Sequence, residues 1–323
     1  MIPNQWYAIL ESHEVPAGRP VGATRLGERL VFWRPKPGEV ACLRDQCVHR
    51  GAALSLGELH EDQLACPFHG LRYDASGQVQ LIPANGRNTP VPAPFRVLGY
   101  PAREAHGFIW LWWGEPRPDL PPIPFFDSLD AGFNYATYVD TWPVHYSRAI
   151  ENQLDVAHLP FVHYNTIGRG HKTLVDGPFV EAFADGLDLY VFNRVDDGTL
   201  PRRPEEIPDP HSGFLLHFRF PNIWQNHVSA DVRIVAAFAP IDETHTRMYL
   251  RFYQRSVRVP IVRELFAWLG AAQGNRIIAS QDKRVVSTQV PPKSELHMGE
   301  KLFQADRPIV EYRRRREELM RET

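Results

Sequence analysis

Two short segments that contain cysteine and histidine constrain the fold of this chain more than any other feature of its sequence. Cys47 and His49 lie in CVHRG, and Cys66 and His69 lie in CPFHG, with 16 residues between the two pairs. Thiolates and imidazoles are ligands that zinc and iron prefer. We therefore expect the two segments to be loops that meet around a metal centre.

The order of the ligands distinguishes between two kinds of metal centre. A structural zinc site usually combines Cys-x2-4-Cys with His-x3-5-His pairs. Here each segment supplies one thiolate and one imidazole instead. This mixture favours a two-iron cluster in which one iron binds both cysteines and the other binds both histidines. Neutral imidazoles in place of two thiolates remove negative charge and raise the reduction potential of such a cluster.

The stretch CVHRGAALSLGE…CPFHG, followed by YDASG, resembles the Rieske motif of the Rieske non-haem iron oxygenases. The resemblance implies a 2Fe–2S cluster bound by Cys47, His49, Cys66 and His69. The third cysteine, Cys42, is left over, and we expect it to be a small buried residue in a strand. Three cysteines exclude a disulfide framework and fit a reducing compartment.

A second group of candidate ligands lies in ENQLDVAHLPFVH, residues 151–163. Asn152, Asp155 and His158 recur every three residues, which predicts one stripe on a helix. His163 would point away from His158 on a continuous helix, so we expect Pro160 to end or kink the helix and bring the two imidazoles together. Two histidines and one carboxylate form the facial triad of non-haem Fe(II) oxygenases.

Asp282, in IIASQDKRVVSTQ, is the candidate carboxylate. On a helix it would share a largely apolar face with Ile278, Val285 and Gln289. A buried carboxylate needs a cation or hydrogen bonds to compensate its charge. From spacing alone, Asp282 could equally bind a metal or form an ordinary buried ion pair. The family pattern N-x2-D-x2-H-x4-H with a distant aspartate matches this chain, so the resemblance implies iron ligation by His158, His163 and Asp282.

The resemblance gives Asp155 a separate role. The matching aspartate of the family hydrogen-bonds an iron-ligand histidine and a Rieske histidine of the neighbouring subunit. By that likeness Asp155 joins His158 to His69 across the interface of a homotrimer, where a carboxylate between two imidazoles orients both. Asn152 is a weaker candidate for a functional role. Its side chain could cap a helix or hydrogen-bond a metal ligand, and the sequence favours neither over the other.

The order of the predicted elements indicates two domains. The runs RLVFWR and EVACLR flank PKPG and predict a hairpin. Residues 71–82 repeat this strand–turn–strand pattern, and FIWLWW at 108–113 reads as a buried strand. Five prolines in EPRPDLPPIP, 115–124, then interrupt helix and strand alike. We place the boundary there and expect domains at 1–116 and 117–323.

The second domain is expected to be α+β. A helical segment at about 142–160 precedes β-rich runs at 187–195, 213–220, 232–241 and 246–254. A helix from about 260 to 289 follows, weakened at Gly270 and Gly274. Strands in succession followed by a long helix favour an antiparallel sheet. The resemblance makes the fold class an N-terminal all-β Rieske domain with a C-terminal helix-grip-like catalytic domain.

Composition limits the classes of partner. A net charge of −2 gives no overall basic field for nucleic acid or an anionic membrane. The start MIPNQWYAIL lacks the pattern of a secretory signal, so we expect a cytoplasmic protein. The tail EYRRRREELMRET predicts a solvated helix with opposing charges. Docking of an acidic redox partner by Arg314 and Arg315 is a minor alternative.

These observations predict a terminal oxygenase component. The resemblance implies that O2 and a mononuclear non-haem Fe(II) do the chemistry, and that an NAD(P)H-dependent reductase, possibly with a ferredoxin, supplies the electrons. The short chain resembles the homotrimeric branch that hydroxylates or demethylates aromatic or polycyclic small molecules. The alternatives are a cis-dihydroxylating dioxygenase, a Rieske electron carrier without oxygenase chemistry, and a zinc-stabilised binding module.

Overall fold

The computed structural model describes residues 1–129 and 132–322. The chain packs as two compact units. Residues 3–123 with 239–242 form the first unit, and residues 124–238 with the rest of the chain from 243 form the second. The sequence predicts a boundary between two folding domains at residues 116 and 117. These compact units are defined by packing and not by independent folding, so that boundary stays a prediction.

The first unit is built from three small sheets, and the expected all-β class is confirmed. One sheet has the order β1-β11-β10, another β2-β3-β4-β9 and the third β5-β6-β7-β8. The strands are β1 (Gln5–Glu11), β2 (Val21–Arg25), β3 (Glu28–Trp33), β4 (Ala41–Arg44), β5 (Glu58–His60), β6 (Gln63–Ala65), β7 (Arg72–Tyr73), β8 (Val79–Leu81), β9 (Gly99–Tyr100), β10 (Ala102–Ala105) and β11 (Phe108–Trp113).

The predicted hairpins of this unit are confirmed. β3 pairs with β4 in antiparallel register around the PKPG turn, and β7 pairs with β8. The strand FIWLWW forms β11 between β1 and β10. Both neighbours cover its hydrogen-bonding edges, and five of its six residues are buried, which explains its uninterrupted apolar sequence.

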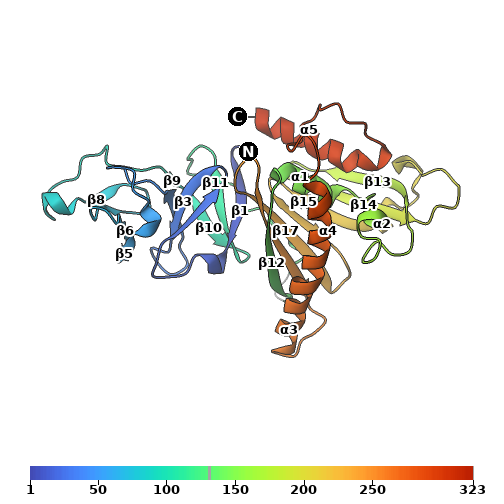
Figure 1. The fold of residues 1–323 in the computed structure, drawn as a ribbon, viewed down its shortest axis with the longest axis horizontal. Coiled ribbons are helices and arrows are strands. Elements are labelled where there is room, and N and C mark those ends of the chain that lie inside the picture. Colours follow the sequence, from blue (N-terminus) through green and yellow to red (C-terminus); the bar gives the residue numbers. More distant parts are fainter. Residues whose placement is uncertain (130–131, 323) are drawn as a thin grey trace. The chain divides into compact units, whose positions relative to one another are not determined.

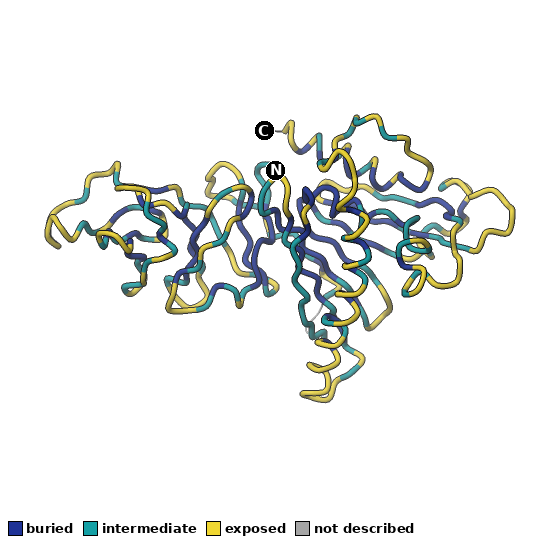
Figure 2. The backbone as a smooth tube through the Cα atoms, viewed as in Figure 1, coloured by how far each residue is buried: buried dark blue, intermediate teal, exposed yellow. Residues whose placement is uncertain are grey.

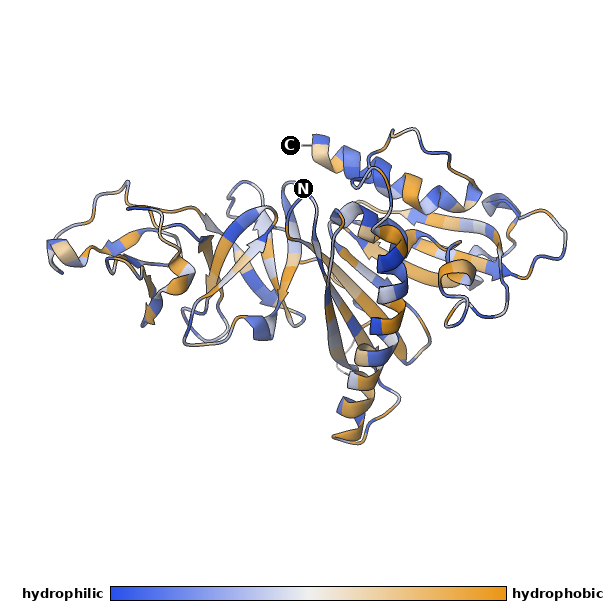
Figure 3. Cartoon of the chain, viewed as in Figure 1, coloured by the Kyte–Doolittle hydropathy of each residue, from blue (hydrophilic) through white to orange (hydrophobic). Residues whose placement is uncertain are grey.

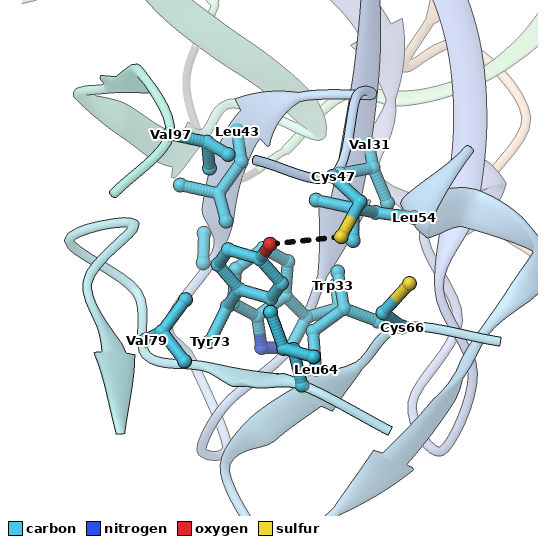
Figure 4. Packing of buried hydrophobic residues seen from close by; sticks show 12 residues of the cluster. Val31, Trp33, Leu43, Cys47, Leu54, Leu64, Cys66, Tyr73, Val79 and Val97 are labelled. Atoms are coloured by element: carbon cyan, nitrogen blue, oxygen red, sulfur yellow. Dashed lines mark hydrogen bonds between the residues drawn. The ribbon is translucent and has the colours of Figure 1, made fainter. Parts of the chain in front are cut away.

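Two hydrophobic clusters fill the first unit. One includes Cys42, which is fully buried on β4 as expected. The other holds Cys47 and Cys66 together with Trp33 and Tyr73 (Figure 4). Burying these apolar groups is the main stabilising contribution to a unit with such short strands. The cysteine ends of the two loops are therefore anchored in a packed core.

The second unit is organised around a seven-stranded sheet with the order β12-β18-β17-β16-β15-β14-β13 (Figure 1). Its strands are β12 (Asn134–Trp142), β13 (Leu174–Ala182), β14 (Gly186–Arg194), β15 (Phe214–Arg219), β16 (Ile223–Asn226), β17 (Val232–Pro240) and β18 (Thr246–Gln254). The pairings of β12 with β18 and of β13 through β17 are antiparallel. The predicted strands and the α+β class are confirmed, and buried residues concentrate in the sheet (Figure 2).

The helices of this unit are α1 (Tyr146–Leu154), α2 (Leu159–Val162), α3 (Val262–Leu269), α4 (Arg276–Val286) and α5 (Arg307–Arg321). Tyr312 of α5 packs on Phe218 of β15 at a ring distance of 5.4 Å. Asn193 of β14 donates to the carbonyl of Val156, after α1. Phe218 lies opposite Leu187 of β14 in the sheet, so the two side chains share a face. Asn193 is six residues after Leu187 on β14, and because side chains alternate along a strand it lies on that same face. One face of the sheet therefore carries both α5 and the segment that follows α1.

The long helix expected at about 260–289 is present from residue 262 to 286, but it is not uniform. α3 and α4 are joined by a π-helical segment, η6 (Gly270–Asn275), at the glycines that weakened the prediction. α3 is rich in hydrophobic residues (Figure 3). Apolar side chains in and just before this helix are exposed, including those of Ile261, Leu265 and Trp268. None of the helices in residues 1–129 and 132–322 is long and apolar enough to cross a bilayer.

The tail is helical as expected, up to Arg321, and Thr323 lies outside the described residues. It is not simply solvated, however, because Arg313 and Arg316 are buried. Arg314 pairs with Glu311, and Arg315 pairs with Glu318 and Glu322. The buried arginines are compensated by partners elsewhere in the unit, which the local charge pattern could not reveal.

Candidate metal centres

The two cysteine–histidine segments form loops with the same hydrogen-bond pattern. Gly51 N–H donates to the Cys47 carbonyl (2.9 Å), and Gly70 N–H donates to the Cys66 carbonyl (3.0 Å). Both glycines have positive φ, 72° and 71°, a conformation in which a side chain is strained. A glycine four residues after each cysteine thus closes each loop, and this signal is present in the sequence.

The loops present their ligands in two layers. Cys47 and Cys66 are 4% and 3% exposed, whereas His49 and His69 lie at the surface. The imidazole rings are adjacent, with centroids 4.7 Å apart. Two buried thiols below two surface imidazoles fit a cluster with one iron bound by sulfur inside and the other bound by nitrogen outside.

Neighbouring groups act on the sulfur atoms. The Tyr73 hydroxyl lies 3.1 Å from Cys47 Sγ and accepts from the N–H of Val48 (Figure 4). Burial raises the pKa of the Cys66 thiol, and the backbone N–H groups of Phe68 and His69 oppose this rise. Iron binding needs the thiolate form, so the metal must displace the proton. Sequence reasoning did not identify Tyr73, although it lies in the YDASG segment that carried the resemblance.

The second group converges as predicted. His158, His163 and Asp282 each offer one ligand atom, and these atoms all lie within 4.8 Å of one another. Asp282 Oδ1 is 2.9 Å from His163 Nε2 and 3.4 Å from His158 Nε2. The side chains of His163 and Asp282 are almost fully buried, and that of His158 is 15% exposed. A carboxylate that is distant in the sequence therefore meets two neighbouring histidines at one point.

The geometry at this point fits a metal ion better than a hydrogen-bonded triad. Asp282 Oδ1 is buried and has no hydrogen-bond partner among the residues that the structure describes, although His163 Nε2 is close. With bonds of about 2.1 Å, neighbouring ligands at right angles lie about 3 Å apart, close to the spacing seen here. Burial lowers the pKa of His158, but Asp155 and Asp282 outweigh it and raise this pKa to about 9. The field that favours the imidazolium also attracts a divalent cation.

The helix that carries these ligands is shorter than predicted. α1 ends at Leu154, and Asp155 has extended backbone angles, φ −76° and ψ 127°. The Asp155 carboxylate accepts a 2.7 Å hydrogen bond from the N–H of Ala157. This local bond competes with continuation of the helix. The predicted helical stripe of Asn152, Asp155 and His158 is therefore wrong.

Pro160 also has a different role from the expected one. It lies in the first turn of α2, where a missing N–H costs no intrahelical hydrogen bond. His158 precedes α2 and His163 follows it, and their ring centroids are 5.2 Å apart. The two imidazoles do approach each other, as predicted, but across a single short turn of helix after the break at Asp155.

Other side chains orient the ligands, and sequence reasoning missed them. Gln281 Oε1 lies 2.8 Å from His163 Nδ1 and accepts from Thr166 Oγ1 at 3.0 Å. Its amide nitrogen donates to Asn165. A neutral acceptor on Nδ1 leaves Nε2 free to bind a metal. The only sequence signal was the position of Gln281 beside Asp282.

The surroundings of Asp155 and Asp282 differ. Asp155 Oδ2 lies 3.6 Å from His158 Nδ1, and its side chain is 30% exposed. Asp282 is buried together with Asn275, Ala279 and Val286 on one face of the η6–α4 helix. The expectation that Asp282 lies on a buried face is confirmed, but Val285 and Gln289, its expected neighbours, are exposed. Asn152 Nδ2 is buried and unpaired among the described residues.

Comparison with known proteins identifies the family. Residues 5–98 match the model of the Rieske [2Fe–2S] domain, and residues 142–322 match that of the vanillate O-demethylase oxygenase C-terminal domain. The second match covers more than half of the chain. The chain belongs to the Rieske oxygenases with this type of catalytic domain, which carry a Rieske 2Fe–2S cluster and a mononuclear non-haem iron.

Individual relatives agree with this assignment. Chlorophyllide a oxygenase of Chlamydomonas reinhardtii is 37% identical over 168 residues, 52% of this chain and 25% of the relative. The 3-chlorobenzoate-3,4-dioxygenase oxygenase subunit of Comamonas testosteroni is 29% identical over 261 residues, 77% of this chain and 58% of the relative. The chain thus spans 25% to 58% of the length of these curated relatives.

A solved structure shares the fold over nearly the whole chain. NdmA of Pseudomonas putida CBB5 superposes with a TM-score of 0.78 at 23% identity, covering 98% of this chain and 90% of NdmA. At this identity the likeness concerns the fold. It confirms the expected combination of an all-β first part and an α+β second part with a large antiparallel sheet.

Proposed function

We propose that this protein is the terminal component of a monooxygenase that hydroxylates or oxidatively demethylates an aromatic or polycyclic small molecule. The observation that carries the proposal is the convergence of His158, His163 and Asp282 in a chain that also holds the cluster loops. Iron bound there supplies activation of O2. The protein's own groups hold the metal by three ligands and leave positions open beside it.

The family match favours demethylation or hydroxylation over dihydroxylation. The catalytic part matches the vanillate O-demethylase type, whereas one relative of this chain is called a dioxygenase. Labelling with 18O2 separates the two reactions. We expect one labelled atom per turnover in the product or in the released formaldehyde, and two labelled atoms in one product would support dihydroxylation instead.

The metal assignment can be tested without knowledge of the substrate. Anaerobically purified protein should contain about three irons and two acid-labile sulfides per chain, without zinc. The variant His163→Ala should fall to about two irons with both sulfides retained, because it removes a ligand of the mononuclear site alone. If the parent retains two irons after addition of Fe(II), the electron-carrier alternative is favoured, and zinc without sulfide would refute the assignment.

Asp155 is proposed to connect the two metal centres of neighbouring subunits. It is partly exposed and lies beside His158, while His69 is exposed on the other unit. Bridging His69 of one subunit and His158 of another requires an oligomer, for which we propose a homotrimer. A separate NAD(P)H-dependent reductase, with or without a ferredoxin, is proposed to reduce the cluster, and the cytoplasm is the proposed location.

The variant Asp155→Ala tests the bridge. It should load both metal centres and nearly abolish turnover, because electrons reach the iron slowly without the connecting carboxylate. Loss of an orienting partner of a ligand alone accounts for about a 10- to 100-fold decrease. Metal content and single-turnover oxidation of the prereduced cluster are measured together. Normal cluster oxidation in this variant would rule out the bridging role.

A further inference from the structure

The face of α3 that is turned away from the sheet is apolar. α3 packs on β18 through Phe266, whose ring lies 6.0 Å from that of Phe252, and Ala267 is its buried residue. Four large apolar residues recur at the spacing of the opposite helix face: Val262, Leu265, Trp268 and Leu269. Their exposed fractions run from 38% to 56%. A surface helix normally turns polar residues to water, so this face is open to an apolar contact.

The position of α3 in the second unit leaves this face accessible. The helix forms the far end of the α3–η6–α4 helix, away from α1 and α5 (Figure 1). It is largely exposed (Figure 2) and largely hydrophobic (Figure 3). Ile261, just before the helix, is 82% exposed and extends the apolar surface. With eight residues, α3 is too short to cross a bilayer.

The segment that contains α3 carries a local positive charge. Residues 255–281 contain four arginines and one glutamate, a local charge of +3, although the whole chain has a net charge of −2. Arg258 is exposed and forms no ion pair with a carboxylate of residues 1–129 or 132–322. Arg263 pairs with Glu264 at 2.9 Å, but both side chains are exposed, so the pair is weak. The apolar face therefore has basic groups beside it.

A hollow of about 520 Å³ gathers these arginines at the start of α3. Arg255, Arg258 and Arg263 line it. Asp231 also lines it and pairs with Arg255 at 3.0 Å. Asn134 of β12 donates to the carbonyl of Arg263 at 3.1 Å, which holds the first turn of α3 beside the hollow. An anion in the hollow would face Arg258 and Arg263, since Asp231 is engaged by Arg255.

The surface of an anionic membrane complements both features. Helices that lie in a membrane interface insert leucine, phenylalanine and tryptophan among the acyl chains and keep basic residues at the headgroups. Basic residues next to such a helix are attracted by anionic lipids. A second copy of this chain that bound face to face would bring the same arginines together, and like charges disfavour that contact. The membrane is therefore the occupant that the charges favour.

We propose that α3 docks on the surface of an anionic membrane, with Leu265 and Trp268 among the acyl chains and Arg258 and Arg263 at lipid phosphates. The net charge of the chain does not predict this surface, because attraction to a membrane depends on charges within about 10 Å of it. The docking is independent of the proposed function. If that function holds, docking brings the catalytic unit to aromatic or polycyclic molecules dissolved in lipid.

The test uses the metal-loaded protein with vesicles of phosphatidylcholine, alone or mixed with an equal part of phosphatidylglycerol. Co-sedimentation at several salt concentrations measures binding. The parent should bind the anionic vesicles at least about tenfold more tightly than the neutral ones at low salt. Leu265→Glu/Trp268→Glu should bind the anionic vesicles at least about tenfold more weakly than the parent, because it removes the apolar contact. Leu265→Met/Trp268→Phe should keep most of the binding.

The arginines are tested in the same assay. Arg258→Glu/Arg263→Glu should bind anionic vesicles at least about tenfold more weakly than the parent and should lose most of the salt dependence. The double Lys variant should bind like the parent. Val195→Glu/Leu200→Glu is the matched control for the apolar variant. It introduces the same charge at two exposed apolar residues of the same unit that lie outside α3, and it should bind like the parent.

The outcomes separate the membrane from other occupants. No binding of the parent to anionic vesicles, or equal binding of the parent and Leu265→Glu/Trp268→Glu, would overturn the proposal. If the parent binds no vesicles and this variant has a smaller molar mass in light scattering, the face belongs to contacts between copies of the chain. Iron and sulfide contents are measured on the same samples, so failure of the proposed function is recognised separately from failure of docking.

Discussion

At the scale of single residues, polar side chains near the iron ligands decide the local backbone and the orientation of each ligand. Asp155 ends α1 by accepting a hydrogen bond from Ala157, which places His158 outside a helix. Gln281 holds the ring of His163 from the opposite side. Neither effect follows from residue spacing, because each depends on the direction of a side-chain oxygen.

Replacement of Gln281 tests its orienting role. Gln281→Leu should weaken Fe(II) binding at the mononuclear site about 10- to 100-fold, since His163 loses the partner of its Nδ1. Gln281→Glu keeps an acceptor at this position and should bind Fe(II) more tightly than the Leu variant. Fe(II) titration of protein that retains its cluster measures both. Gln273→Leu, at an exposed position of the same helix, is the control, and equal affinity of all variants would contradict the role.

At the scale of elements, close packing shapes the α3–η6–α4 helix. A Cβ atom on Gly270 would lie 2.6 Å from Cε1 of Phe252, so the helix can approach β18 only with glycine there. A Cβ atom on Gly274, in the same π-helical segment, would meet no neighbouring atom within 4 Å. One glycine is therefore required by packing, whereas the other is a position of low helix propensity.

Alanine substitutions should have opposite effects at the two glycines. Gly270→Ala should lower the free energy of unfolding by about 1–3 kcal/mol because of overpacking against Phe252. Gly274→Ala should raise it by up to about 1 kcal/mol, because alanine restricts the unfolded chain and favours the helix. Denaturant unfolding of the two variants gives the comparison. The same sign of change in both would argue against this account of the segment.

His145 caps α1 and makes its stability depend on pH. The residue is fully buried, and its Nδ1 lies 2.8 Å from Ser147 Oγ. Burial, assisted by the charges of Arg316 and Lys293, lowers the pKa of His145 to about 3. The unfolded chain binds the proton near pH 6.5. His145 therefore leaves stability unchanged above pH 6.5 and destabilises the fold as the pH falls from 6.5 towards 3.

Replacement of His145 by asparagine should flatten the acid side of the stability curve. Between pH 7 and pH 5 the parent should lose about 2 kcal/mol that His145→Asn does not lose. Asparagine can still cap the helix, so any packing cost is the same at both pH values. His13→Asn is the control, because the His13 side chain is 76% exposed. Parallel stability curves for the parent and His145→Asn would disprove this effect.

At the scale of the whole molecule, the two compact units have different means of stabilisation. The first unit packs its sheets on clusters that include Cys47 and Cys66. The second unit contains a network of two arginines and two glutamates, of which Arg148, Glu151 and Arg313 are buried and Glu300 is 28% exposed. Glu151 pairs with Arg148 and Arg313, which both also pair with Glu300. This network joins α1 to α5, and removal of one partner would leave a buried charge uncompensated.

Removal of the mononuclear iron should destabilise one unit only. We expect calorimetry to show two unfolding transitions, of which one falls when a mild chelator removes Fe(II) and leaves the cluster absorbance intact. Iron at 100 times its dissociation constant contributes about 2.7 kcal/mol to the unit that binds it. Restoring Fe(II) should reverse the change. A shift of both transitions would mean that the units unfold cooperatively.

The sequence by itself determined the local parts of this protein. Both cluster loops, the strand pattern and the pair His158 and His163 could be predicted, because ligand type, spacing and turn glycines act over a few residues. Tertiary structure decided the rest. Asp282 meets the histidines only because α4 packs beside the segment after α1, and Gln281 contacts His163 across 118 residues. The buried arginines of α5 likewise depend on partners in other elements, and such contacts arise from packing, which local spacing does not encode.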